Sequence, residues 1–261
     1  MTDPCIVLRL AGPLQSWGIA SQFNQRRTAS APTKSGIVGL LAAALGRRRK
    51  DPIEDLVSLR MGVRSDQPGS LLRDYHTVSD RPGTPLLSAS LDTKGRQKRT
   101  SPKKYTQPTD RFYLQDAVFI AVLQGRTEFL GDLARAVRHP VFPLALGRRA
   151  CVPTPPILVP ATDDDLWAGT FLSVLRNVPW QASEHVRTKV TSVSVRLAAS
   201  WDDPDGDDSR ADLPASFDPR RRGMATRKVS SGWVDVPTGI DSTASTGPRQ
   251  SDHDPFQLLG W

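Results

Sequence analysis

Residues 117–123 read Ala-Val-Phe-Ile-Ala-Val-Leu, a stretch in which every side chain is apolar. A short run of this kind is typical of a strand that is covered on both faces of a sheet. A helix is expected next, because Thr127 can cap it, Pro140 can end it and one face is apolar at Phe129, Leu130, Leu133 and Val137. The stretch therefore predicts a central strand followed by a helix.

The beginning of the chain repeats this order. Residues 5–10 read Cys-Ile-Val-Leu-Arg-Leu and are followed by Ala-Gly-Pro, which predicts a buried strand closed by a turn. From Ile37 the apolar residues recur at helical spacing, with Ser35 as the expected cap and Gly46 as the stop. The basic run at 47–50 then complements the helix dipole. A solvated helix end explains this run, and a binding surface is the alternative.

Two further strands, one near residues 59–64 and one after Gly147, complete a familiar order of elements. Strand, helix, strand, strand, helix, strand predicts the α+β class and a ferredoxin-like (RRM-like) domain over residues 1–155. Between Asp74 and Asp116 the core pattern dissolves into prolines, glycines and basic residues. A segment of this length is unusual as an ordinary connection between two strands. We therefore interpret it as an extended insertion that leaves the sheet to bind a partner and becomes ordered on binding.

The second half of the chain has weaker signals. Apolar or β-branched residues alternate first at Val186, Thr188 and Val190, and then at the odd-numbered positions Val193, Val195 and Leu197. The change from even to odd positions predicts one long strand with a bulge, and a small β subdomain over 156–237. The acidic stretch 202–208 lacks the acid that an EF-hand needs at its twelfth position, so a solvated turn is expected. Residues 238–261 have the composition of a mobile tail.

The charge of the chain is asymmetric. The net charge is +8 and the sequence pI is about 9.9. Residues 1–150 carry 24 Lys and Arg against 12 Asp and Glu, whereas residues 151–261 carry 11 against 15. A basic first half attracts polyanions, of which RNA or DNA is the commonest for a cytoplasmic protein.

Several classes of protein are disfavoured by composition. With 2 Cys and 4 His scattered along the chain, neither a disulfide scaffold nor a zinc site is expected, and no cofactor or metal is predicted. The sequence contains no apolar run near the ~20 residues that span a bilayer, and the first residues lack the basic flank of a signal peptide. We therefore expect a cytoplasmic location and no membrane partner.

Candidate RNA-binding residues fall into four groups. After the first strand, Trp17 could stack on a base and Gln15 could read one, although Trp17 could equally plug the core. The expected helix start offers phosphate ligands: Arg26, Arg27, Thr33, Lys34 and Ser35. The third group is Arg73, Tyr75 and His76, where His76 could alternatively be the general base or acid of a metal-free ribonuclease. The fourth is Gly147, whose backbone can approach a phosphodiester, with Arg148 and Arg149. The insertion adds Lys103, Lys104 and Arg111.

Four segments together resemble the CasD family, the fifth-family Cas subunits (RAMP superfamily) of the type I-E CRISPR complex Cascade. They are residues 8–18, 32–41, 72–78 and 146–151, in the same order over about the first 155 residues. The remainder is similar only around 214–227. The resemblance implies a ferredoxin-like RAMP domain with a thumb, here about residues 78–115, and a small C-terminal β subdomain.

The resemblance also implies a function. Such a subunit is not catalytic; it caps the 5′ end of the crRNA and holds the repeat-derived 5′ handle. The implied partners are crRNA, the CasC backbone subunit and the CasA large subunit, with target DNA held by the assembled complex. The related type I-C member cuts RNA itself, so a metal-independent endoribonuclease that processes precursor crRNA is the alternative. Four cations are expected on one RNA-facing surface: Arg26, Lys34, Arg148 and Arg149.

Overall fold

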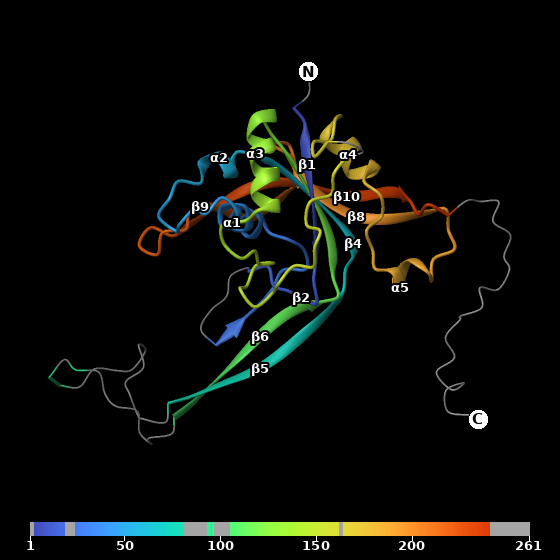
Figure 1. The fold of residues 1–261 in the computed structure, drawn as a ribbon. Coiled ribbons are helices and arrows are strands. Elements are labelled where there is room, and N and C mark those ends of the chain that lie inside the picture. Colours follow the sequence, from blue (N-terminus) through green and yellow to red (C-terminus); the bar gives the residue numbers. More distant parts are fainter. Residues whose placement is uncertain are drawn as a thin grey trace, which may run out of the picture.

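The structure is a computed structural model that describes residues 3–18, 24–80, 93–94, 96, 105–161 and 164–240. It is a mixed α/β fold in which helices pack on a curled antiparallel sheet, and two long strands leave this body as an arm (Figure 1). We refer to these two strands, β5 (Ser70–Asp80) and β6 (Tyr105–Gln115), as the arm. Lys103, Lys104 and the tail beyond Ile240 lie outside the described residues.

The central sheet has six antiparallel strands. Their spatial order is β1 (Cys5–Ala11), β7 (Val118–Gln124), β4 (Arg60–Gln67), β8 (Ser194–Asp202), β10 (Gly223–Pro237) and β9 (Asp208–Ser216). The strands predicted at 5–10, 59–64 and 117–123 are thus confirmed as β1, β4 and β7. In this order β7 lies between β1 and β4, so both of its edges are paired.

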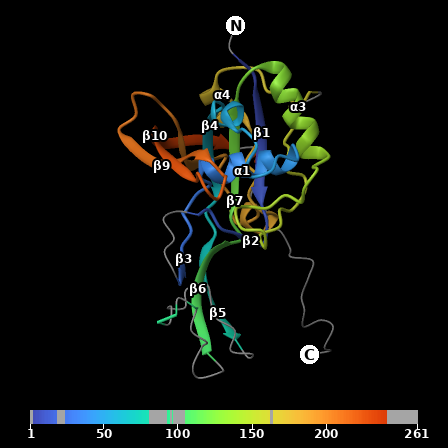
Figure 2. The ribbon, with the colours of Figure 1, turned by 90° about the vertical axis from the view of Figure 1, so that its left-hand side faces the viewer.

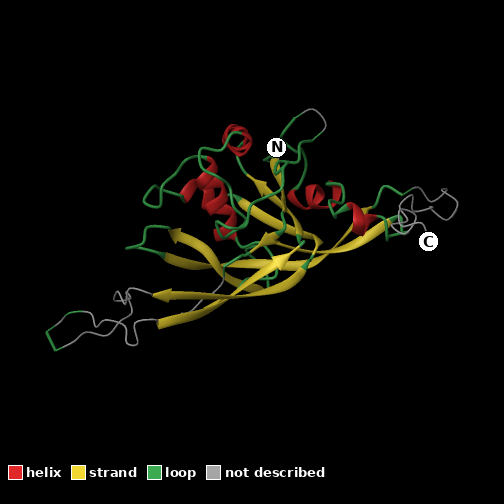
Figure 3. Cartoon of the chain, turned by 60° about the horizontal axis from the view of Figure 1, so that its bottom comes forward, coloured by secondary structure: helices red, strands yellow, loops and turns green. Residues whose placement is uncertain are grey.

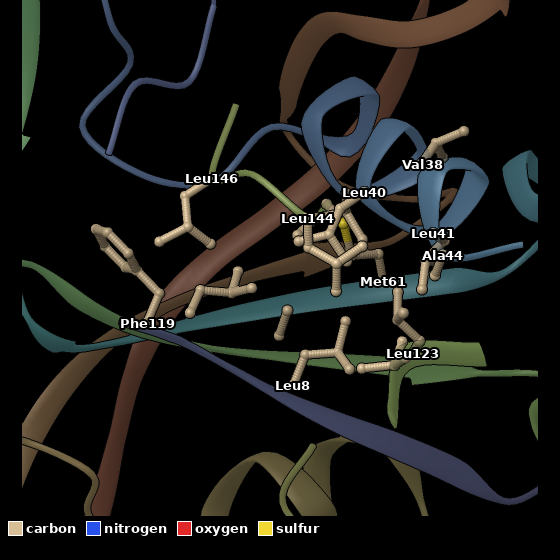
Figure 4. Packing of buried hydrophobic residues seen from close by; sticks show 14 of the residues in the cluster. Leu8, Val38, Leu40, Leu41, Ala44, Met61, Phe119, Leu123, Leu144 and Leu146 are labelled. Atoms are coloured by element: carbon tan, nitrogen blue, oxygen red, sulfur yellow. The ribbon is translucent and has the colours of Figure 1, made fainter. Parts of the chain in front are cut away.

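Both faces of β1 and β7 are buried, which explains their unbroken apolar sequence. On one face Leu8 and Phe119 pack beneath α1 (Lys34–Ala44) and α3 (Thr127–Arg138). Figure 4 shows Leu8, Leu123 and Met61 from the sheet close to Leu41 and Ala44 of α1. On the other face Val7 and Val122 pack against α4 (Phe171–Asn177).

The helices begin slightly away from their predicted caps. Thr33, not Ser35, caps α1, and its Oγ1 accepts from the N–H of Gly36 at 3.3 Å. Thr127 is the first residue of α3 rather than its cap, and Arg126 occupies the cap position without a side-chain hydrogen bond. Two one-turn helices, α2 (Glu54–Val57) and α5 (Glu184–Arg187), complete the set in the described residues.

The predicted insertion begins and ends as a long hairpin. Its strands β5 (Ser70–Asp80) and β6 (Tyr105–Gln115) are paired along their whole length. At its base β6 also pairs with the short strands β2 (Leu14–Gln15) and β3 (Gln25–Arg26). Figure 2 shows β3 beside β6, and Figure 3 shows the two arm strands running out beyond the helices.

The prediction of a regular strand after Gly147 is wrong. Residues 154–161 and 164–167 run antiparallel beside β1 through two isolated bridges, Leu8 with Leu158 and Cys5 with Trp167. The sequence there contains three prolines, at 155, 156 and 160, and a proline cannot donate to a strand ladder. An irregular segment therefore covers this edge of the sheet.

The second half differs from its predicted form in two respects. Val186 lies in α5, so the long strand expected from Val186 to Leu197 exists only as β8, which begins at Ser194. In addition, β8, β10 and β9 form no separate sheet, because β8 pairs with β4 and extends the central one. The domain boundary predicted at residue 156 stays a prediction.

Candidate nucleic-acid interface

Basic side chains converge at the base of the arm. Arg26 on β3 is the register partner of Arg111 on β6, so the two backbones lie side by side. Arg26 and its neighbour Arg27 are exposed, and Arg111 is half-buried. On its other side Arg111 is the register partner of Asp74 on β5, so one carboxylate lies beside these cations.

Arg148 fixes the loop 146–151 against this strand pair. Its guanidinium lies 4.9 Å from the ring centroid of Tyr113. It also donates through Nη1 to the carbonyl oxygen of Phe112 at 3.3 Å and through Nη2 to that of Arg26 at 2.5 Å. The adjacent Arg149 is exposed, and its side chain has no hydrogen bond or ion pair within the described residues. We call Arg26, Arg27, Arg111, Arg148 and Arg149 the arm-base cluster.

The backbone packing at position 147 requires a glycine. Its φ is +85°, and a Cβ at this position would lie 1.8 Å from the carbonyl oxygen of Ser16. The glycine therefore lets two protein backbones approach, with the Ser16 N–H donating to Leu146 O at 3.1 Å. Gly147 itself is exposed, and its predicted contact with a phosphodiester stays a prediction.

The arm separates the remaining candidates onto two faces. His76 lies opposite Thr109 and shares its face with Arg111, which lies two residues further along β6. Arg73 and Tyr75 point to the other face, because successive strand residues alternate. The side chain of Tyr75 is 64% exposed and is available for stacking.

Two of these side chains have defined partners. Asp110 accepts from Arg73 Nε at 2.9 Å, and this hydrogen bond raises the pKa of Arg73. The Nδ1 atom of His76 lies 3.4 Å from the Thr109 hydroxyl oxygen. Within the described residues, the Thr109 hydroxyl is the side-chain group within hydrogen-bond distance of the His76 ring.

Gln15 and Trp17 belong to the core. Both are fully buried. Gln15 Nε2 donates to Leu10 O at 2.9 Å and to Ala117 O at 2.7 Å, and its Oε1 accepts from Trp17 Nε1 at 3.1 Å. The expectation that they contact a base is wrong for this structure, since neither has exposed surface, and the alternative that Trp17 plugs the core is confirmed.

The start of α1 is already occupied by a carboxylate. Asp212 accepts from the backbone N–H of Lys34 at 2.8 Å. The Lys34 ammonium group is buried in an ion pair with Asp202 at 2.7 Å. Thr33 is buried and Ser35 is half-buried, with their hydroxyl oxygens 3.3 Å apart. The predicted phosphate site at this helix start is therefore wrong, and Lys34 is not part of the arm-base cluster.

Arg227 completes this network of charges. Burial lowers the pKa of Arg227, but hydrogen bonds and charge from Asp212 and Asp202 outweigh it and raise the pKa overall. Arg227 Nε donates to Asp212 at 2.7 Å. The acidic turn, which the sequence predicts to be solvated, thus contributes Asp202 to a buried network that joins the two halves of the chain.

Two residues of this region were missed by the sequence reasoning. Tyr113 supports Arg148, and its place on the face of Arg111 follows from strand alternation, a signal that is present in residues 109–113. Asp212 fills the start of α1 from 178 residues away, and no local pattern indicates that contact.

Other kinds of site find little support in the described part of the chain. No group of three or more His, Cys, Asp or Glu there could hold a metal ion, and no helix there is long and apolar enough to span a membrane. An apolar groove of about 300 Å³ lies between α2 and β9. Its lining includes Glu54 and Ser58 but no histidine.

Comparisons with known proteins point in one direction. The sequence profile of the family named Cas_Cas5d and described as CRISPR-associated protein (Cas_Cas5) matches residues 5–230. The chain is 36% identical over 168 residues to the CRISPR system Cascade subunit CasD of Escherichia coli (strain K12), which covers 59% of this chain and 69% of that protein.

Two solved structures have a similar fold. One, described as a CRISPR RNA-guided surveillance complex, contains a chain with 32% sequence identity and a TM-score of 0.70, covering 94% of this chain and 95% of that one. The other, described as the crystal structure of a Cas protein, has 34% identity and a TM-score of 0.64, covering 91% of this chain and 100% of that one.

Proposed function

This chain belongs to the CRISPR-associated Cas5 family, and from that premise we propose that it is a non-catalytic, crRNA-binding subunit of a type I-E Cascade complex. In this role it caps the 5′ end of the crRNA and holds the repeat-derived handle. Its partners are the crRNA, the CasC backbone subunit and the CasA large subunit, and the assembled complex holds target DNA.

The arm-base cluster is the observation that carries the proposal. Arg26, Arg111 and Arg148 converge from three separate parts of the chain, and Arg148 is held there by Tyr113. Clustered arginines bind phosphate oxygens strongly, because each planar guanidinium can donate two parallel hydrogen bonds. The exposed Tyr75 lies on the opposite face of the arm, where an aromatic ring can stack on an unpaired base.

The strand order supports the finer description of the domain as ferredoxin-like. Residues 154–161 and 164–167 lie beside β1, and β7 and β4 follow in that spatial order, with α1 and α3 on one face. This is the arrangement that the predicted order of strands and helices requires if the irregular segment replaces the last strand. The arm between β4 and β7 corresponds to the proposed thumb.

The alternative is a metal-independent endoribonuclease with His76 as its general acid or base. The surroundings of His76 favour the binding role, because a catalytic imidazole is normally oriented by a carboxylate or another titratable group within hydrogen-bond reach. Thr109 supplies only a hydroxyl.

Salt-dependent binding of handle RNA tests the proposal. For single strands the slope of log K against log salt falls by about 0.7 for each phosphate that is no longer neutralised, so the double variant Arg26→Ala/Arg149→Ala should reduce it by about 1.4. Arg220→Ala/Arg221→Ala is a matched control, since it removes two exposed arginines elsewhere. Equal slopes in wild type and the Arg26/Arg149 variant would contradict the proposed site.

The same samples test for catalysis. Wild-type protein incubated with repeat RNA without metal should shift the RNA and leave it intact. A cleavage product that disappears in His76→Ala would instead support the endoribonuclease.

A further inference from the structure

The turn after α1 presents three adjacent exposed cations. Arg48, Arg49 and Lys50 are exposed, and none of their side chains has a hydrogen bond or ion pair within the described residues. Their neighbour Arg47 differs, because it pairs with Asp55 through Nη1 and Nη2, the two terminal nitrogens of its guanidinium. We call Arg48, Arg49 and Lys50 the basic turn.

The backbone of this turn is firmly held. Gly46 has a φ of +75°, and its N–H donates to Ala43 O at 3.1 Å while that of Arg47 donates to Ala42 O at 2.8 Å. This is the Schellman pattern of a helix end. Asp51, the nearest acid in the chain, accepts through Oδ2 from the N–H of Arg48 at 2.6 Å and forms no ion pair with the three cations within the described residues.

An exposed apolar pair lies beside the basic turn. Val141 and Phe142 are 65% and 42% exposed. Their N–H groups donate to the carbonyl oxygens of Ala44 and Ala43 at 3.0 and 3.1 Å, which holds them at the carboxyl end of α1. Val141 packs so closely on Gly46 that a Cβ there would lie 2.8 Å from Val141 Cγ1.

The basic turn is separated from the arm-base cluster. The 11 residues of α1 lie between the turn and Thr33, a span of about 16 Å at 1.5 Å per residue. A Cβ on Gly36, at the far end of α1, would lie 2.6 Å from Trp17, which follows two residues after the β2 strand that pairs with the base of β6. In Figure 1 the loop joining α1 to α2 lies at the left edge of the body, whereas the arm extends from the lower side of the body.

We propose that the basic turn is a second polyanion site, which contacts the phosphodiester backbone of double-stranded DNA while the arm-base cluster holds a different strand. Three adjacent unpaired cations repel one another, and neutralising them with phosphates releases counterions from the DNA. A projecting turn suits the outward phosphates of a duplex, whereas single strands are usually held in grooves lined with aromatic rings. Phe142 provides only one such ring.

The test compares two triple variants of the full chain. Arg48→Gln/Arg49→Gln/Lys50→Gln removes the basic turn, and Arg220→Gln/Arg221→Gln/Arg222→Gln removes an equal charge from another exposed run. Both are measured for binding to a DNA duplex without repeat sequence, across a range of salt. The slope of log K against log salt should fall by about 2.7 in the first variant, at about 0.9 for each neutralised phosphate, and much less in the second.

Other outcomes overturn the inference. An equal change in both variants would show an effect of net charge alone. If the first variant lost handle RNA affinity in parallel with duplex affinity, the basic turn would belong to the handle site. Binding of poly-glutamate in place of duplex would assign the turn to an acidic protein. Because the duplex measurement needs no handle RNA, its result stands apart from that of the proposed function, and thermal unfolding confirms that each variant is folded.

Discussion

The Nζ atom of Lys34 lies 2.7 Å from Oδ2 of Asp202, and this ion pair joins the first turn of α1 to the end of β8 across 168 positions of the chain. Asp202 also accepts from the Met61 N–H at 2.9 Å and from Arg227. A lysine that local sequence places beside phosphate-binding residues is therefore part of the scaffold.

Replacing Lys34 by methionine should lower the free energy of unfolding by about 1.5–3 kcal/mol, because a largely buried carboxylate loses a charged donor. Handle RNA affinity, measured where the variant is folded, should equal that of the wild type. Arg149→Ala should behave in the opposite way, with weaker RNA binding and unchanged stability. Denaturant unfolding and fluorescence anisotropy separate the two, and an RNA defect in folded Lys34→Met would contradict this assignment.

Trp17→Ala should destabilise the protein by about 3–5 kcal/mol, because a large buried side chain is removed from the core. Gly36→Ala should act through the same contact, since its Cβ would lie 2.6 Å from Trp17 Cε3. Thermal unfolding measures both effects. A normally stable Trp17→Ala protein with reduced RNA affinity would contradict this assignment and place the indole on the RNA-binding surface.

Tyr113→Leu should weaken handle RNA binding, because Arg148 loses the ring on which it is stacked. A double-mutant cycle with Arg148→Ala should give a coupling energy of about 0.5–2 kcal/mol. RNA affinities of the four proteins at one salt concentration provide the measurement, with Tyr113→Phe as the control that keeps the ring. Additive effects of the two substitutions would mean that Tyr113 does not position Arg148 for RNA.

Stability should fall in alkaline solution through Cys5. Burial raises the pKa of the Cys5 thiol from 9.0 to about 11. The folded state therefore retains a proton that the unfolded chain releases. The contribution of the protonated thiol to the free energy of unfolding is complete below pH 9 and is lost as the pH rises to about 11. The loss is roughly 2–3 kcal/mol at 1.36 kcal/mol per pKa unit.

Denaturant unfolding of wild type and Cys5→Ala between pH 8 and about 11 checks this dependence, because the variant lacks the titrating group. Cys151 remains in both proteins, so its own raised pKa is common to the two curves. Parallel curves for wild type and Cys5→Ala would remove Cys5 as the source of the alkaline loss.

The elements that the sequence predicts well are those whose signal lies within the element. The apolar residues 5–10 and 117–123 specify buried strands, and the helical spacing from Ile37 and after Thr127 specifies two helices. Hydrophobic burial acts on each side chain in proportion to its apolar area, so a local pattern records which faces are covered. The sequence also predicts Arg26 and Arg148 on one surface, and the hydrogen bond from Arg148 Nη2 to the carbonyl oxygen of Arg26 places the two residues side by side.

Whether an individual polar side chain is buried or exposed was decided only by the tertiary structure. Lys34 and Arg149 are both cations in segments that resemble one family, yet one is buried against Asp202 and the other is exposed. Gln15 is buried because three groups from separate strands and turns satisfy its amide. A charged or polar side chain leaves water only where distant partners complete its hydrogen bonds, and those partners are brought together by the fold rather than by their spacing along the chain.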